Sequence, residues 1–146
     1  MKTSTMTIVE RNTLLAQRVW DEVWHQGNFS AMHEIFDPNF IRHDPNGREL
    51  RGREQNEQYI RQTRATFPDL QYRVEDVIAN ADKVVMRYRF QGTHLGDGLG
   101  FPPTGKKVTY TGILIQRFVD GKIVEQWTEA DLLTLFQQLG VLPKLK

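Results

Sequence analysis

Cysteine is absent from this chain of 146 residues, and neither sign of charge is in clear excess. Without cysteine the protein has no disulfide, no thiolate nucleophile and no zinc site built on thiolates. The absence is compatible with a reducing cytoplasm, where we expect the protein to be located. The formal net charge is +1, with no basic block and no acidic tail, so charge does not indicate a nucleic acid as a partner.

Long apolar runs are missing as well. No run approaches the roughly 20 residues that a helix needs to cross a bilayer, and we expect no membrane partner. The opening segment MKTSTMTIVERN lacks the continuous apolar stretch of a signal peptide. No repeat or low-complexity segment divides the chain. Residues 1–146 are therefore expected to form a single domain, large enough for a core and one pocket.

Apolar residues change their spacing at Pro68. Before it they recur with the helical period of about 3.6, and after it they alternate with the period of two that is typical of strands. Consecutive strands joined by hairpins predict an α+β fold, in which N-terminal helices cover one face of a curved antiparallel sheet and leave a cavity. The predicted helices are residues 7–25, 30–36, 53–66 and 132–140, the predicted turn is DPNF at 37–40, and the predicted strands are 40–43, 70–79, 83–94, 107–119 and 123–131.

One connection between predicted strands is unusually long. The segment GTHLGDGLGFPPTGK, residues 92–106, contains five glycines and two prolines. A hairpin loop needs only about two to five residues, and long ordered loops in small domains often have a function. We expect this loop to fold over the mouth of the pocket, with Leu99, Phe101 and the two prolines in the lining.

Asp131 stands between the last predicted strand and the last predicted helix. One interpretation is an N-cap of that helix, a position that aspartate favours. The other is an acid in a partly apolar cleft, where burial would raise its pKa and suit it to proton transfer. Strand parity places Asp131 on the same face as Trp127 and Glu129, and the residues alone leave both interpretations open.

Other polar and aromatic side chains have two interpretations each. His94 opens the long loop and is either a polar group at the pocket rim or a loop imidazole bonded to nearby backbone. His43 has the same ambiguity, and the neighbouring Asp44 suits an Asx-turn. Trp20 and Trp24, in the first predicted helix, either fill the core or line a hydrophobic pocket.

Motifs for metals and common cofactors are not found in the sequence. No pair of histidines, and no histidine with a carboxylate, stands at metal-ligand spacing on one element, so no metal site is predicted. The glycines of GDGLG lead to prolines and another strand rather than to the start of a helix, which excludes a dinucleotide-binding loop.

Three motifs in register carry a resemblance to a known family. GTHLGDGLGFPPTGKKV, RFVDGKIVEQW and DLLTLFQQLG resemble, in order and spacing, the SnoaL-like polyketide cyclases and their ester-cyclase relatives. The segments VWHQGN and FIRHDPNG fit the same pattern, so the resemblance extends from about residue 14 to residue 140. It implies a cone-shaped α+β fold of the nuclear-transport-factor-like type, a pocket without a cofactor, and a homodimer or tetramer.

The resemblance also implies roles for single residues. Asp131, nine residues before Gly140, matches the acid/base carboxylate of the family, and His94 matches its loop histidine. Arg117 stands where the cyclases have a catalytic histidine. An arginine stays charged and cannot replace a neutral imidazole, but it can stabilise an enolate or bind a carboxylate.

Together these observations predict a cofactor-independent enzyme that acts on a small hydrophobic carbonyl compound by acid/base chemistry, in an aldol or isomerase reaction like those of polyketide cyclases. The alternative is a non-catalytic module that binds a small ligand or dimerises, since a fold does not determine a function. Epoxide hydrolysis, which needs an Asp–Arg–Asp set, is a lesser alternative. A homodimer is also expected because Val84, Val85 and the run from Ile113 to Ile115 place apolar residues on both sheet faces.

Overall fold

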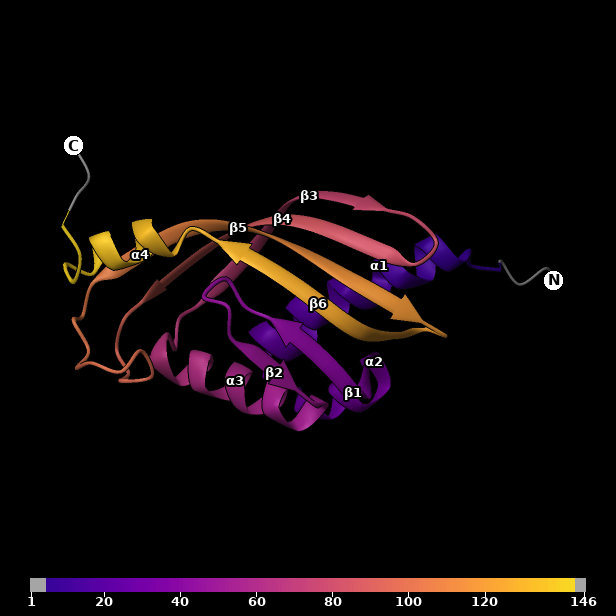
Figure 1. The fold of residues 1–146 in the computed structure, drawn as a ribbon, viewed down its shortest axis with the longest axis horizontal. Coiled ribbons are helices and arrows are strands. Elements are labelled where there is room, and N and C mark those ends of the chain that lie inside the picture. Colours follow the sequence, from indigo (N-terminus) through magenta and orange to yellow (C-terminus); the bar gives the residue numbers. More distant parts are fainter. Residues whose placement is uncertain (1–4, 144–146) are drawn as a thin grey trace.

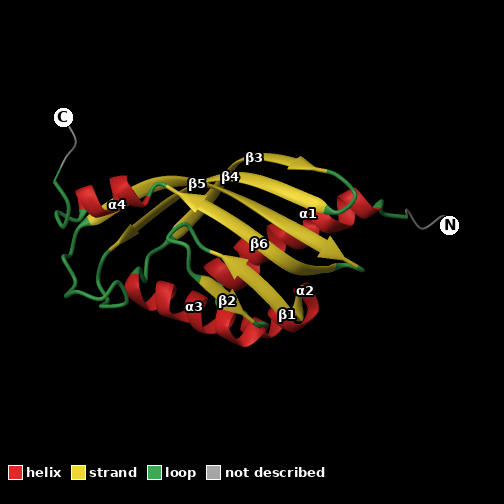
Figure 2. Cartoon of the chain, viewed as in Figure 1, coloured by secondary structure: helices red, strands yellow, loops and turns green. Residues whose placement is uncertain are grey.

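A computed structural model describes residues 5–143 and contains a curved six-stranded sheet with its long helices on one side (Figure 1). Figure 2 shows the same view with helices, strands and loops distinguished by colour. The helical elements are α1 (Ile8–Arg18), a π-helical continuation η1 (Val19–His25), a 3-10 turn η2 (Phe29–Ala31), α2 (Met32–Ile35), α3 (Arg53–Thr66) and α4 (Leu132–Gln138). The strands are β1 (Phe36–His43), β2 (Glu49–Arg51), β3 (Gln71–Ala79), β4 (Lys83–Thr93), β5 (Lys107–Val119) and β6 (Lys122–Ala130).

The sheet has the strand order β2-β1-β6-β5-β4-β3. Strands β3 to β6 form an antiparallel meander, which confirms the prediction for the second half of the chain. Strand β1 pairs with β6 in parallel, so the sheet is mixed rather than purely antiparallel. No hairpin joins these two strands, because α3 and the rest of the meander lie between them in sequence, and their relative direction was therefore not fixed by a turn.

The first strand is longer than the sequence indicates. The segment DPNF, predicted as a turn, lies within β1, where the pairing with β6 shifts register between Phe36 and Ile41. Local turn chemistry is still present in this irregular stretch, since the Asp37 carboxylate accepts the backbone N–H of Asn39. Strand β2 was not predicted; its three residues, Glu49–Arg51, are too few to show a periodic pattern.

The predicted first helix, residues 7–25, is realised as α1 followed by η1. Thr7 caps α1 by accepting the backbone N–H of Glu10. Helix α3 has the predicted bounds and is tied to η1 through Arg64, whose Nε donates to the carbonyl of Trp24. In residues 5–143 no helix is long and apolar enough to cross a membrane.

The alternation of β4 determines which side of the sheet carries the core. Val84, Met86, Tyr88 and Phe90 are buried against the helices, and the intervening arginines are exposed on the outer face, as the period of two predicts. The inner face and the helices form one hydrophobic cluster. This cluster reaches the C-terminal ends of β1 and β6, where the packing opens into a cavity.

The long loop, residues 92–106, is fastened to the end of α3. The backbone N–H groups of Leu95 and Gly96 both donate to the carbonyl of Thr66. The approach requires glycine, because a Cβ on Gly96 would lie 2.6 Å from the carbonyl oxygen of Ala65. The loop therefore lies beside α3 at the end of the sheet that also carries α4 (Figure 1).

Asp131 is the N-cap of α4. One carboxylate oxygen accepts the backbone N–H of Thr134 at 3.1 Å, and the other accepts its hydroxyl at 2.6 Å. These two hydrogen bonds lower the pKa of the exposed Asp131 carboxyl. Helix α4 is then held on β5 by Gln138, whose side-chain amide exchanges two hydrogen bonds with the backbone of Thr109.

We predict that Asp131→Ala lowers the free energy of unfolding by about 0.5–2 kcal/mol, while Asp131→Asn changes it by only a few tenths, because asparagine caps a helix about as well as aspartate. Thermal unfolding of both variants at pH 7 measures the difference. The lowered pKa means that the ionic part of the cap is present above the unfolded pKa of about 3.9 and is lost as the pH falls below it. Equal, near-zero effects in both variants would contradict the cap.

The outer face of the sheet carries a row of apolar and aromatic side chains at one level of the strands. Two branched side chains on this face are strongly exposed, Ile78 at 67% and Ile113 at 48%. Exposed branched side chains grouped on a sheet face are typical of an association surface. The row, read across paired positions of the sheet, is His43, Trp127, Ile115, Val85 and Ile78.

From this surface we expect the chain to associate with a second copy of itself. Ile115→Lys, at the centre of the row, should shift the protein toward the monomer without unfolding it, because the side chain lies outside the core. Sedimentation at micromolar concentration measures both forms, and the exposed substitution Leu133→Lys on α4 is the control. A wild-type protein that sediments as a monomer would contradict the expectation.

Candidate active site

A cavity of about 260 Å³ opens between α3, α4, the long loop and the inner face of the sheet. All four tyrosines of the chain contribute to its wall. Apolar residues of α4 and the tip of the loop complete it, so the lining combines aromatic rings and aliphatic side chains with one polar side. The lining residues are Arg42, Asp44, Pro45, Asn46, Arg48, Tyr59, Gln62, Thr63, Thr66, Phe67, Tyr72, Tyr88, Gly98, Leu99, Tyr110, Thr128, Ala130, Leu132, Leu135 and Phe136.

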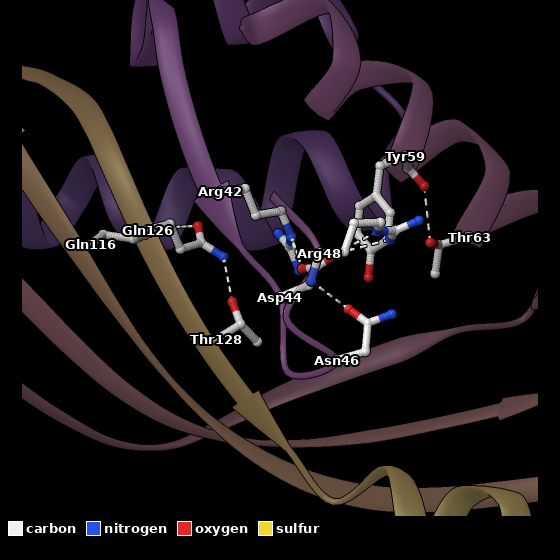
Figure 3. Close-up of polar contacts among 9 residues, drawn as sticks. All are labelled: Arg42, Asp44, Asn46, Arg48, Tyr59, Thr63, Gln116, Gln126 and Thr128. Atoms are coloured by element: carbon white, nitrogen blue, oxygen red, sulfur yellow. Dashed lines mark hydrogen bonds and ion pairs between the residues drawn. The ribbon is translucent and has the colours of Figure 1, made fainter. Parts of the chain in front are cut away.

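The polar side is built on a buried carboxylate, Asp44, held by two arginines (Figure 3). Arg42 Nε donates to Asp44 Oδ1 at 2.6 Å. Arg48 donates to Asp44 Oδ2 through Nε at 3.2 Å and Nη2 at 2.8 Å. The Asp44 side chain is only 4% exposed, so its charge is compensated within the protein rather than by water.

Local sequence explains how these three residues meet. Arg42 and Asp44 are two positions apart along an extended segment, which places both on the inner face of the sheet. The chain then turns at Asn46 and Gly47, where Gly47 has a φ of +79°. The Asn46 side chain accepts the backbone N–H of Arg48 and directs Arg48 back toward Asp44.

Aromatic rings cover the same cluster. The guanidinium of Arg42 lies 4.4 Å from the ring centroid of Tyr59, and that of Arg48 lies 5.2 Å from it. Burial raises the pKa of Tyr72, Tyr88 and Tyr110, so these hydroxyls stay protonated. Among the lining residues the charged groups are therefore two guanidiniums and one carboxylate, a net charge of +1.

A second polar group lies on β5 and β6, beside the arginine cluster (Figure 3). Gln116 Nε2 donates to Gln126 Oε1 at 3.0 Å, and Gln126 Nε2 donates to Thr128 Oγ1 at 2.9 Å. All three side chains are buried on the inner face. Thr128 belongs to the wall of the cavity, so this chain of hydrogen bonds ends at the site.

The predicted position of Asp131 in the pocket is corrected by the structure. Its neighbours Ala130 and Leu132 line the cavity, but the Asp131 carboxylate is exposed and caps α4. Trp127 and Glu129 do share the face expected from parity, and this is the outer face of the sheet. On β6 the inward positions are those of Gln126 and Thr128, one residue out of phase with the predicted set.

Arg117 and His43 also lie on the outer face, away from the cavity. Arg117 donates to the carboxylate of Glu125 at 3.0 Å, and His43 Nε2 lies 2.7 Å from the same carboxylate. The His43 ring stacks on Trp127 with centroids 5.5 Å apart. The structure thus joins these predicted site residues to one another in a surface cluster rather than to the pocket.

His94 is fully buried but does not line the cavity. Its Nδ1 accepts the backbone N–H of Thr104 at 3.0 Å, which closes the base of the loop and supports the backbone-bonded interpretation. Phe101 packs on the His94 ring with centroids 5.4 Å apart and is not a lining residue, whereas Leu99 is one, as predicted. The two prolines of the loop are exposed and do not line the cavity.

Trp20 and Trp24 were predicted as core or pocket residues, and the structure places both in the core and outside the wall of the main cavity. They line a second, smaller cavity of about 20 Å³ that adjoins the main one. The central cluster was not predicted from the sequence, because Asp44 suits a turn and no local pattern marked Arg42 as a site residue. The sequence did contain one indication. Arg42 and Asp44 share the parity of the apolar Phe40, so the period of a strand places all three side chains on one face.

Comparison with known proteins agrees with this architecture. The sequence profile of the family described as SnoaL-like polyketide cyclase matches residues 14–139. Aklanonic acid methyl ester cyclase DauD of Streptomyces sp. (strain C5) is 30% identical over 111 residues, which are 75% of this chain and 66% of DauD, slightly less than two thirds of its length. Aklanonic acid methyl ester cyclase DnrD of Streptomyces peucetius is 30% identical over 73% of this chain and 72% of its own.

Solved structures give the same result. TsrD from Streptomyces laurentii superposes with a TM-score of 0.80 at 30% identity, covering 90% of this chain and 96% of that one. A protein of Jannaschia sp. CCS1, titled a SnoaL-like polyketide cyclase, superposes with a TM-score of 0.87 at 26% identity, covering 97% and 100% of the two chains. The profile match spans most of the sequence, and the cone-shaped α+β fold is shared. The chain belongs to the SnoaL-like polyketide cyclase family.

Proposed function

We propose that the protein is a cofactor-independent enzyme that transfers a proton at a carbon next to a carbonyl group, as an aldol cyclisation or an isomerisation requires, and that Asp44 is the base. The observation that carries the proposal is the position of Asp44: it is the only carboxylate among the residues that line the cavity. This assigns to Asp44 the role that the sequence analysis gave to Asp131.

The carboxylate of Asp44 has room for a proton. A carboxylate offers about four acceptor sites, and Arg42 and Arg48 together use three in the described contacts. One site on Oδ1 is left for a substrate. An aspartate base need not have a high pKa when the enolate is well stabilised; in ketosteroid isomerase the base has a pKa of about 4.6.

The same cavity can stabilise the enolate that proton removal creates. The terminal nitrogens of Arg42 make no hydrogen bond to a described side chain, and the hydroxyl of Tyr88 is a protonated donor on the wall. A charged guanidinium and a neutral hydroxyl in a desolvated site are effective oxyanion partners. Gly112 leaves space for this hydroxyl, since a Cβ there would lie 2.4 Å from it.

The substrate class follows from the wall and from the relatives. A cavity of about 260 Å³ with several aromatic rings in its wall and one cationic side suits a flat, fused-ring ketone or ester. DauD and DnrD are named as cyclases of aklanonic acid methyl ester, a compound that is therefore the first candidate substrate to assay with this chain. A simple carbon acid, 2-tetralone, provides an assay of the proton-transfer step without any further chemistry.

We predict that the wild-type protein accelerates exchange of the α-protons of 2-tetralone in deuterated water, followed by NMR. Asp44→Asn should reduce this rate by about 10²–10⁴, the usual effect of removing a general base. Asp131→Asn is the matched control and should stay within about twofold of wild type.

The two variants separate the alternatives. Loss of exchange in Asp131→Asn, with Asp44→Asn active, would contradict the assignment and restore Asp131 as the base. A wild-type protein that accelerates neither 2-tetralone exchange nor conversion of aklanonic acid methyl ester would contradict the proposed enzyme and favour a ligand-binding module. Removing one member of a buried ion cluster destabilises a protein. Circular dichroism of Asp44→Asn is therefore the control that shows the variant is folded.

A second prediction concerns the tyrosine hydroxyls, which must be protonated to donate. Burial raises the pKa of Tyr72, Tyr88 and Tyr110, so their contribution to stability is complete below the unfolded pKa of about 10 and is lost as the pH rises beyond it. In an alkaline titration at 295 nm, the folded protein should ionise at most the equivalent of one of its four tyrosines before it unfolds. Ionisation of all four near pH 10, with circular dichroism unchanged, would contradict the burial of these hydroxyls.

A further inference from the structure

The small cavity that adjoins the main one contains an unused hydrogen-bond acceptor. Gln116 is 2% exposed, and its Oε1 has no hydrogen-bond partner in the described part of the chain. A buried polar atom without a partner costs free energy, so an unsatisfied oxygen at a cavity indicates an occupant that donates a hydrogen bond. Gln116, Gln126 and Thr128 line this cavity together with Arg42, Tyr72 and Tyr88, which it shares with the main cavity.

The direction of the hydrogen bonds specifies a second requirement. Thr128 Oγ1 accepts from Gln126, which in turn accepts from Gln116. The hydroxyl proton of Thr128 is therefore free to be donated to something else. The occupant must then donate to Gln116 and accept from Thr128. A water molecule or a ligand hydroxyl does both, whereas a carbonyl oxygen accepts only and an ammonium donates only.

The size of the cavity sets a third requirement. Its volume of about 20 Å³ is enough for one oxygen-sized group, since about 10–15 Å³ suffices for a water molecule. Trp20, Trp24 and Leu114 form its apolar walls. A methoxy group or a ring would not fit among them without rearranging the core.

The two cavities share part of their walls. Arg42, Tyr72, Tyr88 and Thr128 line both of them. A molecule that binds in the main cavity with its carbonyl group at Arg42 therefore already contacts part of the wall of the small cavity. A polar substituent on such a molecule can reach Thr128 directly.

We propose that Gln116, Gln126 and Thr128 form a subsite that selects substrates carrying a hydroxyl group on the ring system, away from the reacting carbonyl. The hydroxyl donates to Gln116 Oε1 and accepts from the Thr128 hydroxyl. The inference rests on the proposed function only in taking the main cavity as the substrate site, and it does not depend on which carboxylate is the base. It narrows the substrate class from flat ketones and esters in general to their hydroxylated members.

The test is a binding comparison without turnover. Calorimetry measures the dissociation constants of 2-naphthoate, of its 5-, 6- and 7-hydroxy derivatives, and of the 6-methoxy derivative, whose carboxylate can pair with the cationic side of the cavity. At least one hydroxy derivative should bind about tenfold more tightly than 2-naphthoate, because it forms two hydrogen bonds in place of a released water. The methoxy derivative should show no gain.

Three variants give the control. Gln116→Leu and Thr128→Val remove one partner each with little change in shape, and each should abolish the preference, measured as the ratio of the dissociation constants of 2-naphthoate and the hydroxy derivative for the same variant. Gln62→Leu, the same substitution at an exposed position of the main cavity, should retain the preference. Asp44→Asn should also retain it, so failure of the base assignment and failure of the subsite are separate outcomes.

The proposal is overturned if 2-naphthoate and its hydroxy derivatives bind the wild-type protein equally well, because the small cavity would then keep a permanent water. It is also overturned if no ligand binds, and in that case the main cavity fails as the substrate site as well. Survival of the preference in either Gln116→Leu or Thr128→Val overturns it too, since the hydroxyl group would then be recognised without that partner.

Discussion

The buried carboxylate of Asp44, shared by two guanidiniums, is the constraint on which the site depends. A charge that is 4% exposed must be compensated by charge or hydrogen bonds within the protein. Arg42 supplies this from β1, and Arg48 supplies it from beyond the turn, so the conformation of residues 42–48 is fixed by one electrostatic requirement. Tyr59 on α3 covers both arginines, which ties the helix to the same cluster.

The other elements shape the space in front of this cluster. Helix α4, begun by its cap at Asp131 and pinned to β5 by Gln138, closes one end of the cavity. The long loop, with His94 buried at its base and Gly96 against α3, supplies Leu99 as another part of the wall. The residues that match the catalytic positions of the family thus make structural contacts here, while a charged cluster at the end of the first strand faces the cavity.

The fold could be predicted from the sequence because its signals are local. Three features each depend on a few neighbouring residues, and the structure has them as expected. They are the switch of period at Pro68, the hairpin turn at Asp120 and Gly121, and Gly140 after the last helix. The parallel pairing of β1 with β6 was missed because it joins segments about eighty residues apart. No turn or spacing encodes such a contact.

The site was harder to predict for a physical reason. Alternation along a strand shows which residues share a face but not which face is covered, so Asp131 and Arg117 were expected inside although their face is the outer one. On β6 the buried side chains next to these positions are those of Gln126 and Thr128. Because both are polar, the sequence showed no apolar alternation that would have identified their face as the one toward the core. Arg42 and Asp44 become recognisable only when Arg48 and Tyr59 are brought to them by the turn and by α3.

The central claim is that the reaction takes place beside Asp44, and a crystal structure with 2-naphthol tests it most directly. This phenol is a planar analogue of the enol of 2-tetralone, so it marks where the enolate would lie. We predict that its oxygen lies within hydrogen-bond distance of Arg42 or Tyr88, with the adjacent ring carbon facing the Asp44 carboxylate. A ligand bound with its reacting edge at Asp131, or on the outer face near Arg117 and His43, would contradict it.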